Sequence, residues 1–236
     1  MEEQSTRRYT STGKCNLCGR TLAKTGMTRH LQSCWERQGV SAASLPGRTG
    51  PKAREGRVFL IVVGTRYSSD YWMHLEVPAV ASLRELDRFL RRTWLECCGH
   101  MSAFEIGGER HYSDSVDGLG GRSMNVQIGK LLAPGVKIYH EYDFGTPTEL
   151  TLKVASERKD FTEGKSIQVL ARNDAPEFIC DSCGNTATAM CAQCIYEGKG
   201  WLCDECSRDH ACGEEMLLPV VNSPRMGMCG YTGWGH

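Results

Sequence analysis

The chain has 236 residues, 40% of them hydrophobic, and it carries 28 Lys plus Arg against 28 Asp plus Glu. A chain of this length can bury one medium-sized core together with small satellite units that need another source of stability. No apolar run approaches the roughly 18 residues of a membrane-spanning helix, and residues 1–14 contain no apolar signal segment. We therefore expect a cytoplasmic protein.

The zero net charge hides an uneven distribution along the chain. Residues 1–57 contain eleven Lys or Arg and four Asp or Glu, a net charge of +7, whereas residues 179–236 contain three and seven, a net charge of −4. A basic segment of this kind is where contact with nucleic acid is expected, although a solubilising tail would have the same composition.

The thirteen cysteines favour metal binding. An odd count does not suit complete intramolecular disulfide pairing, and the repeated C-x2-C spacing is typical of zinc ligands in a reducing compartment. Structural zinc ions take four Cys or His ligands each. The spacing should therefore divide the ligands into groups of four.

Residues 1–37 predict a basic zinc finger. Cys15, Cys18, His30 and Cys34 follow a C-x2-C-x11-H-x3-C pattern, close to the spacing of C2H2 fingers with Cys in the last position. His30 and Cys34 are four residues apart and would share one face of a helix. The pattern predicts the first structural zinc site.

Three basic residues flank the predicted helix of this finger. We expect Arg20, Lys24 and Arg29 to contact the phosphates of a nucleic acid, either DNA or RNA. A finger that serves as a protein-docking knob is the alternative. Residues 38–56, rich in Gly, Ser, Ala, Pro and basic side chains, predict a flexible linker.

Residues 57–175 predict an α+β domain. Strands are expected at residues 57–64 and 71–77, and Ser82 and Glu85 form a capping box that begins a helix with apolar positions as far as Leu95. Further strands are expected at residues 103–106, 137–142, 149–154 and 166–170. A hairpin, one helix and further strands suit a ubiquitin-like, β-grasp-like sheet with the helix on one face.

Several segments of this domain resemble the plasmid open-reading-frame-three-like family, a pRiA-type family whose relatives include an insertion-element passenger protein. The resemblance covers residues 58–170 and rests on Val77-Pro78, residues 82–94, residues 100–108, Tyr142-Asp143-Phe144-Gly145 and Leu150-Thr151-Leu152. It implies a fold and a setting among mobile elements, but no defined activity. The family usually continues with Asp, Trp and His, where this chain has residues 146–149 instead.

An enzyme is the alternative interpretation of the middle domain, with a site around His140, Tyr142 and Asp143. No metal-protease or similar signature links these residues to His74, His100 or His111, so we expect no catalytic cluster.

Residues 176–221 contain eight ligands in paired steps and predict two further zinc ions. The spacing resembles cross-braced B-box and MYND modules. That resemblance implies one ion held by Cys180, Cys183, Cys203 and Cys206, and a second held by Cys191, Cys194, His210 and Cys212. Sequential pairing of neighbouring ligands remains open. Either arrangement leaves no coordination position for water, so structural zinc is expected, three ions in the whole chain.

The remaining cysteines have simpler interpretations. Adjacent cysteines do not easily chelate one ion, so Cys97 and Cys98 are interpreted as a buried small hydrophobic residue and its neighbour. Cys229 is interpreted as a spare thiol in a glycine-rich tail, residues 222–236, which either docks on the middle domain or forms a disordered end.

Together these features predict a zinc-binding, non-enzymatic adaptor. The basic finger would contact nucleic acid or a nucleoprotein, and the acidic C-terminal zinc module would bind a protein partner.

Overall fold

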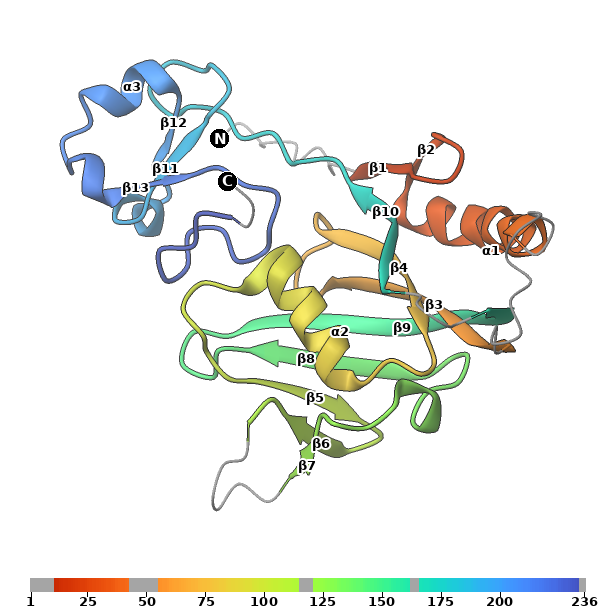
Figure 1. The fold of residues 1–236 in the computed structure, drawn as a ribbon. Helices are drawn as coiled ribbons and strands as arrows, with labels where there is room; N and C mark the ends of the chain where they lie inside the picture. Colours follow the sequence, from red (N-terminus) through yellow and green to blue (C-terminus); the bar gives the residue numbers. More distant parts are fainter. Residues whose placement is uncertain (1–10, 43–54, 115–120, 162–165, 234–236) are drawn as a thin grey trace, which may run out of the picture.

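The computed structural model describes residues 11–42, 55–114, 121–161 and 166–233. Within these ranges the protein is a mixed α/β structure with a ten-stranded sheet, few helices and a separate three-stranded sheet near the C-terminus (Figure 1). The helices are α1 (Lys24–Ala42), α2 (Leu83–Leu90) and the short α3 (Asp204–Arg208). No helix in the described ranges is both long and apolar enough to span a bilayer.

The large sheet runs in the order β2-β1-β10-β4-β3-β9-β8-β5-β6-β7. Its strands are β1 (Thr12–Cys15), β2 (Thr21–Ala23), β3 (Glu55–Thr65), β4 (Trp72–Pro78), β5 (Ser102–Ile106), β6 (Glu109–Tyr112), β7 (Arg122–Ser123), β8 (Lys137–Tyr142), β9 (Thr148–Phe161) and β10 (Gln168–Asn173). The central strand β3 pairs antiparallel with both β4 and β9. The small sheet, in the order β12-β11-β13, contains β11 (Ala189–Cys191), β12 (Trp201–Leu202) and β13 (Leu217–Pro219).

The middle of strand β3, residues 58–63, is apolar because both of its faces are covered. Phe59, Ile61 and Val63 point into the core beneath α2. Val58 and Leu60, on the alternate positions, belong to a second core shared with the N-terminal finger. A strand buried on both faces is a continuous hydrophobic run, as the sequence shows here.

Helix α2 begins as its sequence predicts. The Ser82 hydroxyl accepts a hydrogen bond from the Glu85 backbone N–H at 3.2 Å, and the Glu85 carboxylate accepts one from the Ser82 N–H at 2.7 Å, so the capping box is confirmed. The N–H of Ser82 also lowers the pKa of Glu85. After Leu90 the chain continues through a wider π-type turn, Arg91–Leu95, which buries Trp94 and Leu95.

The N-terminal finger is joined to the large sheet. Strand β1 pairs antiparallel with β10, and Met27, Leu31 and Trp35 of α1 pack against residues of β3 and β4. The Trp35 indole N–H donates to Glu76 at 2.5 Å, and the Arg158 guanidinium lies 4.4 Å from the centre of the Trp35 ring. Tertiary packing therefore fixes the finger on the face of the sheet opposite α2.

The predicted linker is shorter than the sequence suggested. Helix α1 continues to Ala42 and strand β3 begins at Glu55, so both ends of the predicted segment 38–56 belong to regular elements. Residues 43–54 lie outside the described residues. Met27, Leu31 and Trp35 in the first part of the finger helix pack on the sheet, an interaction that composition does not reveal.

A buried polar group links α2 to the sheet. The Asp87 carboxylate accepts hydrogen bonds from the Ser102 hydroxyl at 2.6 Å and from His140 Nε2 at 2.8 Å, and all three side chains are buried. Burial opposes ionisation of Asp87, but the hydrogen bonds and the charges of His140 and Arg91 lower its pKa below the usual value.

Replacing Asp87 with Ala should destabilise the fold by about 3 kcal/mol, because two buried donors lose their acceptor. Since the folded-state pKa is lowered, the wild-type contribution is present above the unfolded pKa and is lost as pH falls through the folded value. Urea unfolding at neutral and acid pH measures both effects. Equal stability of variant and wild type at neutral pH would contradict this assignment.

Candidate metal centres and the adjoining basic groove

The first candidate metal centre lies in the finger. Cys15 ends β1, Cys18 follows in a tight turn, and His30 and Cys34 project from α1. Their four ligand atoms lie within 4.8 Å of one another, with Cys18 Sγ 3.2 Å from His30 Nε2. The turn depends on Gly19, whose φ of 78° is left-handed and whose N–H donates to the Cys15 carbonyl at 2.8 Å.

The thiols of this centre differ in acidity. The Arg20 backbone N–H lowers the pKa of Cys18, whereas burial and the neighbouring Cys18 sulfur raise the pKa of Cys34 to about 11. A thiol must lose its proton to bind a metal ion, so loading of this centre releases protons and is favoured by higher pH.

The C-terminal module forms two candidate centres. Cys180, Cys183, Cys203 and Cys206 make one group, and Cys191, Cys194, His210 and Cys212 make the other. Within the groups Cys183 Sγ is 3.5 Å from Cys203 Sγ, and Cys194 Sγ is 3.5 Å from both His210 Nε2 and Cys212 Sγ. These groups match the cross-braced arrangement, and the sequential groups are not formed among the described residues.

Backbone elements hold the ligands of the module in place. Gly184, with a φ of 78°, repeats the turn seen at Gly19, and its N–H donates to the Cys180 carbonyl at 2.9 Å. Burial raises the pKa of Cys180, but backbone N–H groups outweigh this and lower it to about 6. Cys191 ends β11, and Cys203 precedes α3.

A fourth group was not predicted from the sequence. The ligand atoms of Cys97, Cys98, His100 and Cys229 also lie within 4.8 Å of one another. Cys97 is only partly buried and Cys98 is exposed, so the interpretation of one of them as a buried small hydrophobic residue is wrong. Cys229 lies beside them rather than being a spare, isolated thiol. No signal in the sequence indicates this group because Cys229 lies 131 residues from Cys98.

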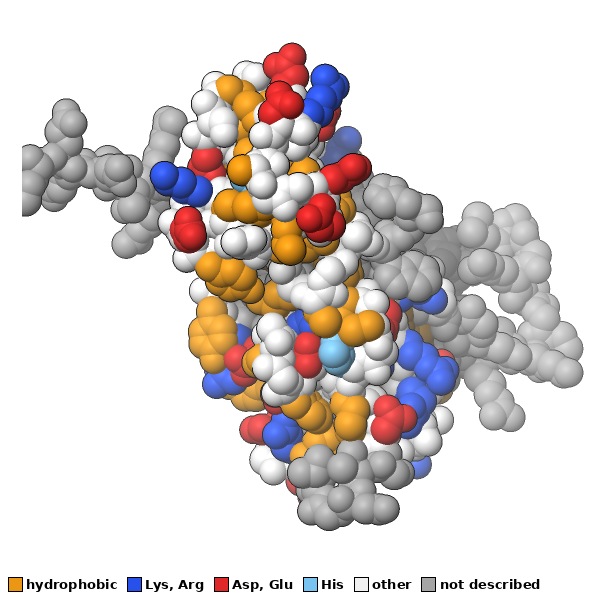
Figure 2. All heavy atoms as spheres, turned by 90° about the vertical axis from the view of Figure 1, so that its left-hand side faces the viewer, with side chains coloured by type: hydrophobic (Ala, Val, Ile, Leu, Met, Phe, Trp, Pro, Cys, Tyr) orange, Lys and Arg blue, Asp and Glu red, His pale blue; other side chains and the backbone are white. Residues whose placement is uncertain are grey.

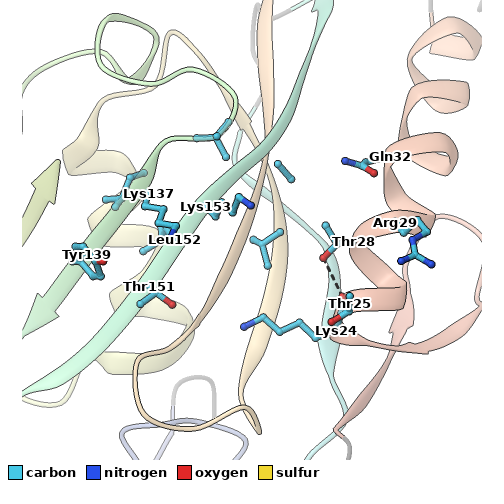
Figure 3. A pocket seen from close by; sticks show the side chains of 15 residues that line it. Lys24, Thr25, Thr28, Arg29, Gln32, Lys137, Tyr139, Thr151, Leu152 and Lys153 are labelled. Atoms are coloured by element: carbon cyan, nitrogen blue, oxygen red, sulfur yellow. Dashed lines mark hydrogen bonds between the residues drawn. The ribbon is translucent and has the colours of Figure 1, made fainter. Parts of the chain in front are cut away.

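A basic groove separates the finger helix from the open part of the sheet (Figure 3). It has a volume of about 720 Å³ and is lined by residues of α1, β3, β8 and β9 and of the turn before β8. Four cations, Lys24, Arg29, Lys137 and Lys153, line it, with no carboxylate among the described residues of its wall. Lys137 and Lys153 face each other across the β8–β9 pair.

The structure separates the three predicted phosphate contacts. Lys24 and Arg29 line the groove, whereas Arg20 is exposed outside it, in the turn before β2. Lys24 reaches from the start of α1 towards the sheet (Figure 3), and burial lowers its pKa. Lys137 and Lys153 were not predicted, although the alternation of their strands does place them on the face away from α2.

The residues of the enzyme alternative bond to different partners. His140 hydrogen-bonds to Asp87 in the core, whereas Asp143 accepts from Arg225 at 2.5 Å. The Tyr142 hydroxyl donates to Glu96 at 3.1 Å. His140 and Asp143 therefore do not form the hydrogen-bonded pair that a general base and its orienting carboxylate would require.

The other histidines of the middle domain are also dispersed. His74 is buried against α1, where its Nε2 lies 2.7 Å from the Thr28 hydroxyl, and burial and the Lys24 charge lower its pKa to about 3. His111 is buried beside the Ser123 carbonyl, and His100 belongs to the fourth group. These side chains do not assemble into one site.

Comparison with known proteins adds no function. No protein-family model matches the sequence, and no curated protein matches it. Among solved structures, a protein of unknown function from Methanosarcina mazei Go1 matches this chain. The structural alignment covers 57% of this chain and 78% of that protein, with a TM-score of 0.44 and 14% sequence identity. The class of the protein therefore follows from its own structure: a mixed α/β fold with four cysteine-rich groups, among the described residues, that could hold metal ions.

Proposed function

We propose that this protein is a zinc-binding, non-enzymatic adaptor that contacts nucleic acid or a nucleoprotein with its N-terminal part and a protein partner with its C-terminal module. The single observation that carries the proposal is the basic groove between α1 and the sheet. Sets of Lys and Arg aligned along a groove bind phosphates and release counterions, which makes the affinity dependent on salt.

The groove favours a single-stranded nucleic acid. Tyr139 is 42% exposed at its wall, and the Arg66 guanidinium lies 5.4 Å from the centre of the Tyr139 ring. Exposed aromatic rings stack on unpaired bases while neighbouring cations follow the backbone. In this proposal Lys137 and Lys153 would contact the backbone of the strand beside the partly exposed Tyr139 ring.

The C-terminal module supports the protein-binding half of the proposal. Carboxylates are distributed over its outer surface (Figure 2), and the exposed ones include Asp204, Glu205, Asp209, Glu214 and Glu215. Among them Tyr196 is 86% exposed and Met216 is 37% exposed. Apolar side chains within an acidic surface suit a partner with a basic and partly apolar face.

Zinc is the proposed occupant of the metal centres. Cysteine sulfur and histidine nitrogen in tetrahedral groups of four are the usual ligands of structural zinc, with no open position for catalysis. We also propose that the middle domain, residues 57–175, belongs to the plasmid open-reading-frame-three-like family. Its likeness to a ubiquitin-like grasp is proposed for the hairpin β3–β4 and helix α2 only.

The test is binding of fluorescent single-stranded and double-stranded oligonucleotides at several salt concentrations. Replacing Arg29, Lys137 and Lys153 with Gln should weaken binding and make the dependence of log K on log salt shallower by about 2 for a single strand. All three side chains are exposed, so the fold should be retained.

A matched variant controls for net charge. Arg88, Arg92 and Lys130 are equally exposed cations on the α2 side of the sheet, and their replacement with Gln removes the same charge. This control should bind nearly as well as the wild type. Equal losses in the two variants would show a non-specific charge effect, and no binding by the wild type would refute the nucleic-acid half of the proposal.

A further inference from the structure

The fourth cysteine-rich group has the dimensions of a metal site. Cys98 Sγ lies 3.7 Å from Cys97 Sγ and 3.6 Å from Cys229 Sγ. His100 Nε2 lies 2.9 Å from Cys98 Sγ and 3.3 Å from Cys229 Sγ. Sulfur ligands around a tetrahedral zinc ion with Zn–S bonds of about 2.3 Å are separated by roughly 3.5 to 3.8 Å, and the two sulfur–sulfur distances lie in this range, while the histidine nitrogen lies closer. A disulfide would bring two sulfurs to about 2.05 Å.

The loop after α2 is shaped to present three of these ligands. Gly99 has a φ of 81° and lies between Cys98 and His100, so the chain reverses within the short motif. The Glu96 carboxylate accepts from the Gly99 N–H at 2.6 Å and is held by Arg91 at 2.5 Å. This network lets the adjacent cysteines and the histidine converge despite their closeness in sequence.

The C-terminal tail brings the fourth ligand. The Ser223 hydroxyl donates to the Trp94 carbonyl at 2.5 Å, and the buried Arg225 donates to Asp143 at 2.5 Å and to the Thr146 carbonyl at 2.5 Å. These contacts anchor the tail on the middle domain four residues before Cys229. The tail is therefore docked on the middle domain at Ser223 and Arg225, and Tyr231 further along it is also buried.

The backbone is strained where the two parts meet. Asp143 and Cys229 are the non-glycine residues with a positive φ in the described ranges, at 66° and 51°. Asp143 lies beside the group, with its carboxylate 3.5 Å from His100 Nε2. Residues in this conformation are uncommon and concentrate at functional sites.

The complete cysteine content of the chain supports the same conclusion. The sequence has thirteen cysteines, and each belongs to one of the four groups. Three groups contain three Cys and one His, and one contains four Cys. Without the fourth group, Cys97, Cys98 and Cys229 would be the cysteines that belong to no candidate metal site.

We propose that Cys97, Cys98, His100 and Cys229 form a fourth metal site, for a thiophilic divalent cation such as Zn²⁺, which clips the C-terminal tail to the middle domain. Three thiolates and a neutral imidazole around a divalent cation have a net charge of −1. Arg225 offsets this charge, since its Nη2 lies 3.6 Å from Cys97 Sγ and donates to it. This site does not depend on nucleic-acid binding.

The test is the number of zinc ions per chain, measured by native mass spectrometry on full-length protein kept under reducing, zinc-replete conditions. The wild type should hold four ions, and Cys229→Ser should hold three. Retention of three ions in the variant would itself show that the other centres are folded. Cys98→Ser with His100→Ala, which removes two ligands from the other side of the site, should likewise hold three.

Thr232→Ser is the matched control, since Thr232 is exposed in the same tail and contributes no ligand; it should retain four ions. A wild type with three ions and free or disulfide-bonded thiols at Cys98 and Cys229 would overturn the proposal. Four ions in both ligand variants would place the fourth ion elsewhere and would also overturn it.

Discussion

Removing metal from the protein with a strong zinc chelator should unfold the C-terminal module while leaving the central strands of the large sheet folded. The buried core of the module consists of Cys180, Cys191 and Cys203 with Leu202, so its residues have little apolar surface to bury once the metal is absent. Structural zinc contributes about 10 kcal/mol or more of folding free energy in zinc-finger peptides, which is more than so small a core supplies.

Hydrogen exchange with mass spectrometry measures this effect. Amides of β11, β12 and β13 should lose their protection in the chelator, whereas those of β3 and α2 should keep it because their core is apolar. Replacing the buried Cys191 with Ala should reproduce the loss without a chelator. A chelator already saturated with zinc is the control, and unchanged protection in metal-free protein would refute a structural function for the ions.

Replacing Arg225 with Met should destabilise the protein by about 3 to 5 kcal/mol, because it leaves the Asp143 carboxylate buried without its partner. Arg225 is fully buried and also donates to the Thr148 hydroxyl at 3.1 Å. Burial opposes ionisation of Asp143, but Arg225 and backbone N–H groups lower its pKa below the usual value. The stabilisation is therefore present above the unfolded pKa and is lost as pH falls through the folded value.

Chemical denaturation of the single and double variants tests this pair. Asp143→Asn can keep the left-handed backbone conformation, so adding it to Arg225→Met should recover part of the lost stability. Arg66→Met, which breaks an exposed ion pair with Glu149, is the control and should have a much smaller effect. An Arg225→Met variant as stable as the control would contradict the anchoring of the tail.

Local patterns were sufficient for most elements of the middle domain, although the short strands β6 and β7 were not predicted. The capping box at Ser82 and the apolar alternation of β3 and β4 predict the helix and the hairpin from neighbouring residues alone. Strand β9 extends beyond the predicted residues 149–154, to Phe161, because it pairs along the whole of β3. That pairing is long-range, so no local pattern could have given its end.

The candidate sites divide in the same way. In the finger and in the C-terminal module the ligands occur in short, regular spacings, which identify them without tertiary information. Lys137 and Lys153 line a groove only because α1 packs over the sheet. The sequence did not indicate this packing, since the residues between α1 and the sheet were predicted to form a flexible linker.

The sequence by itself determined the mixture of one large sheet with few helices and the ligands of three candidate metal centres, because both follow from periodicities and spacings of a few residues. The tertiary structure alone decided that the finger docks on the sheet, that the basic groove lies beside it, and that Cys97, Cys98, His100 and Cys229 converge. The physical reason is the range of the interactions. Cys98 and Cys229 are 131 residues apart, and only the packing of the tail through Ser223 and Arg225 brings their sulfurs together.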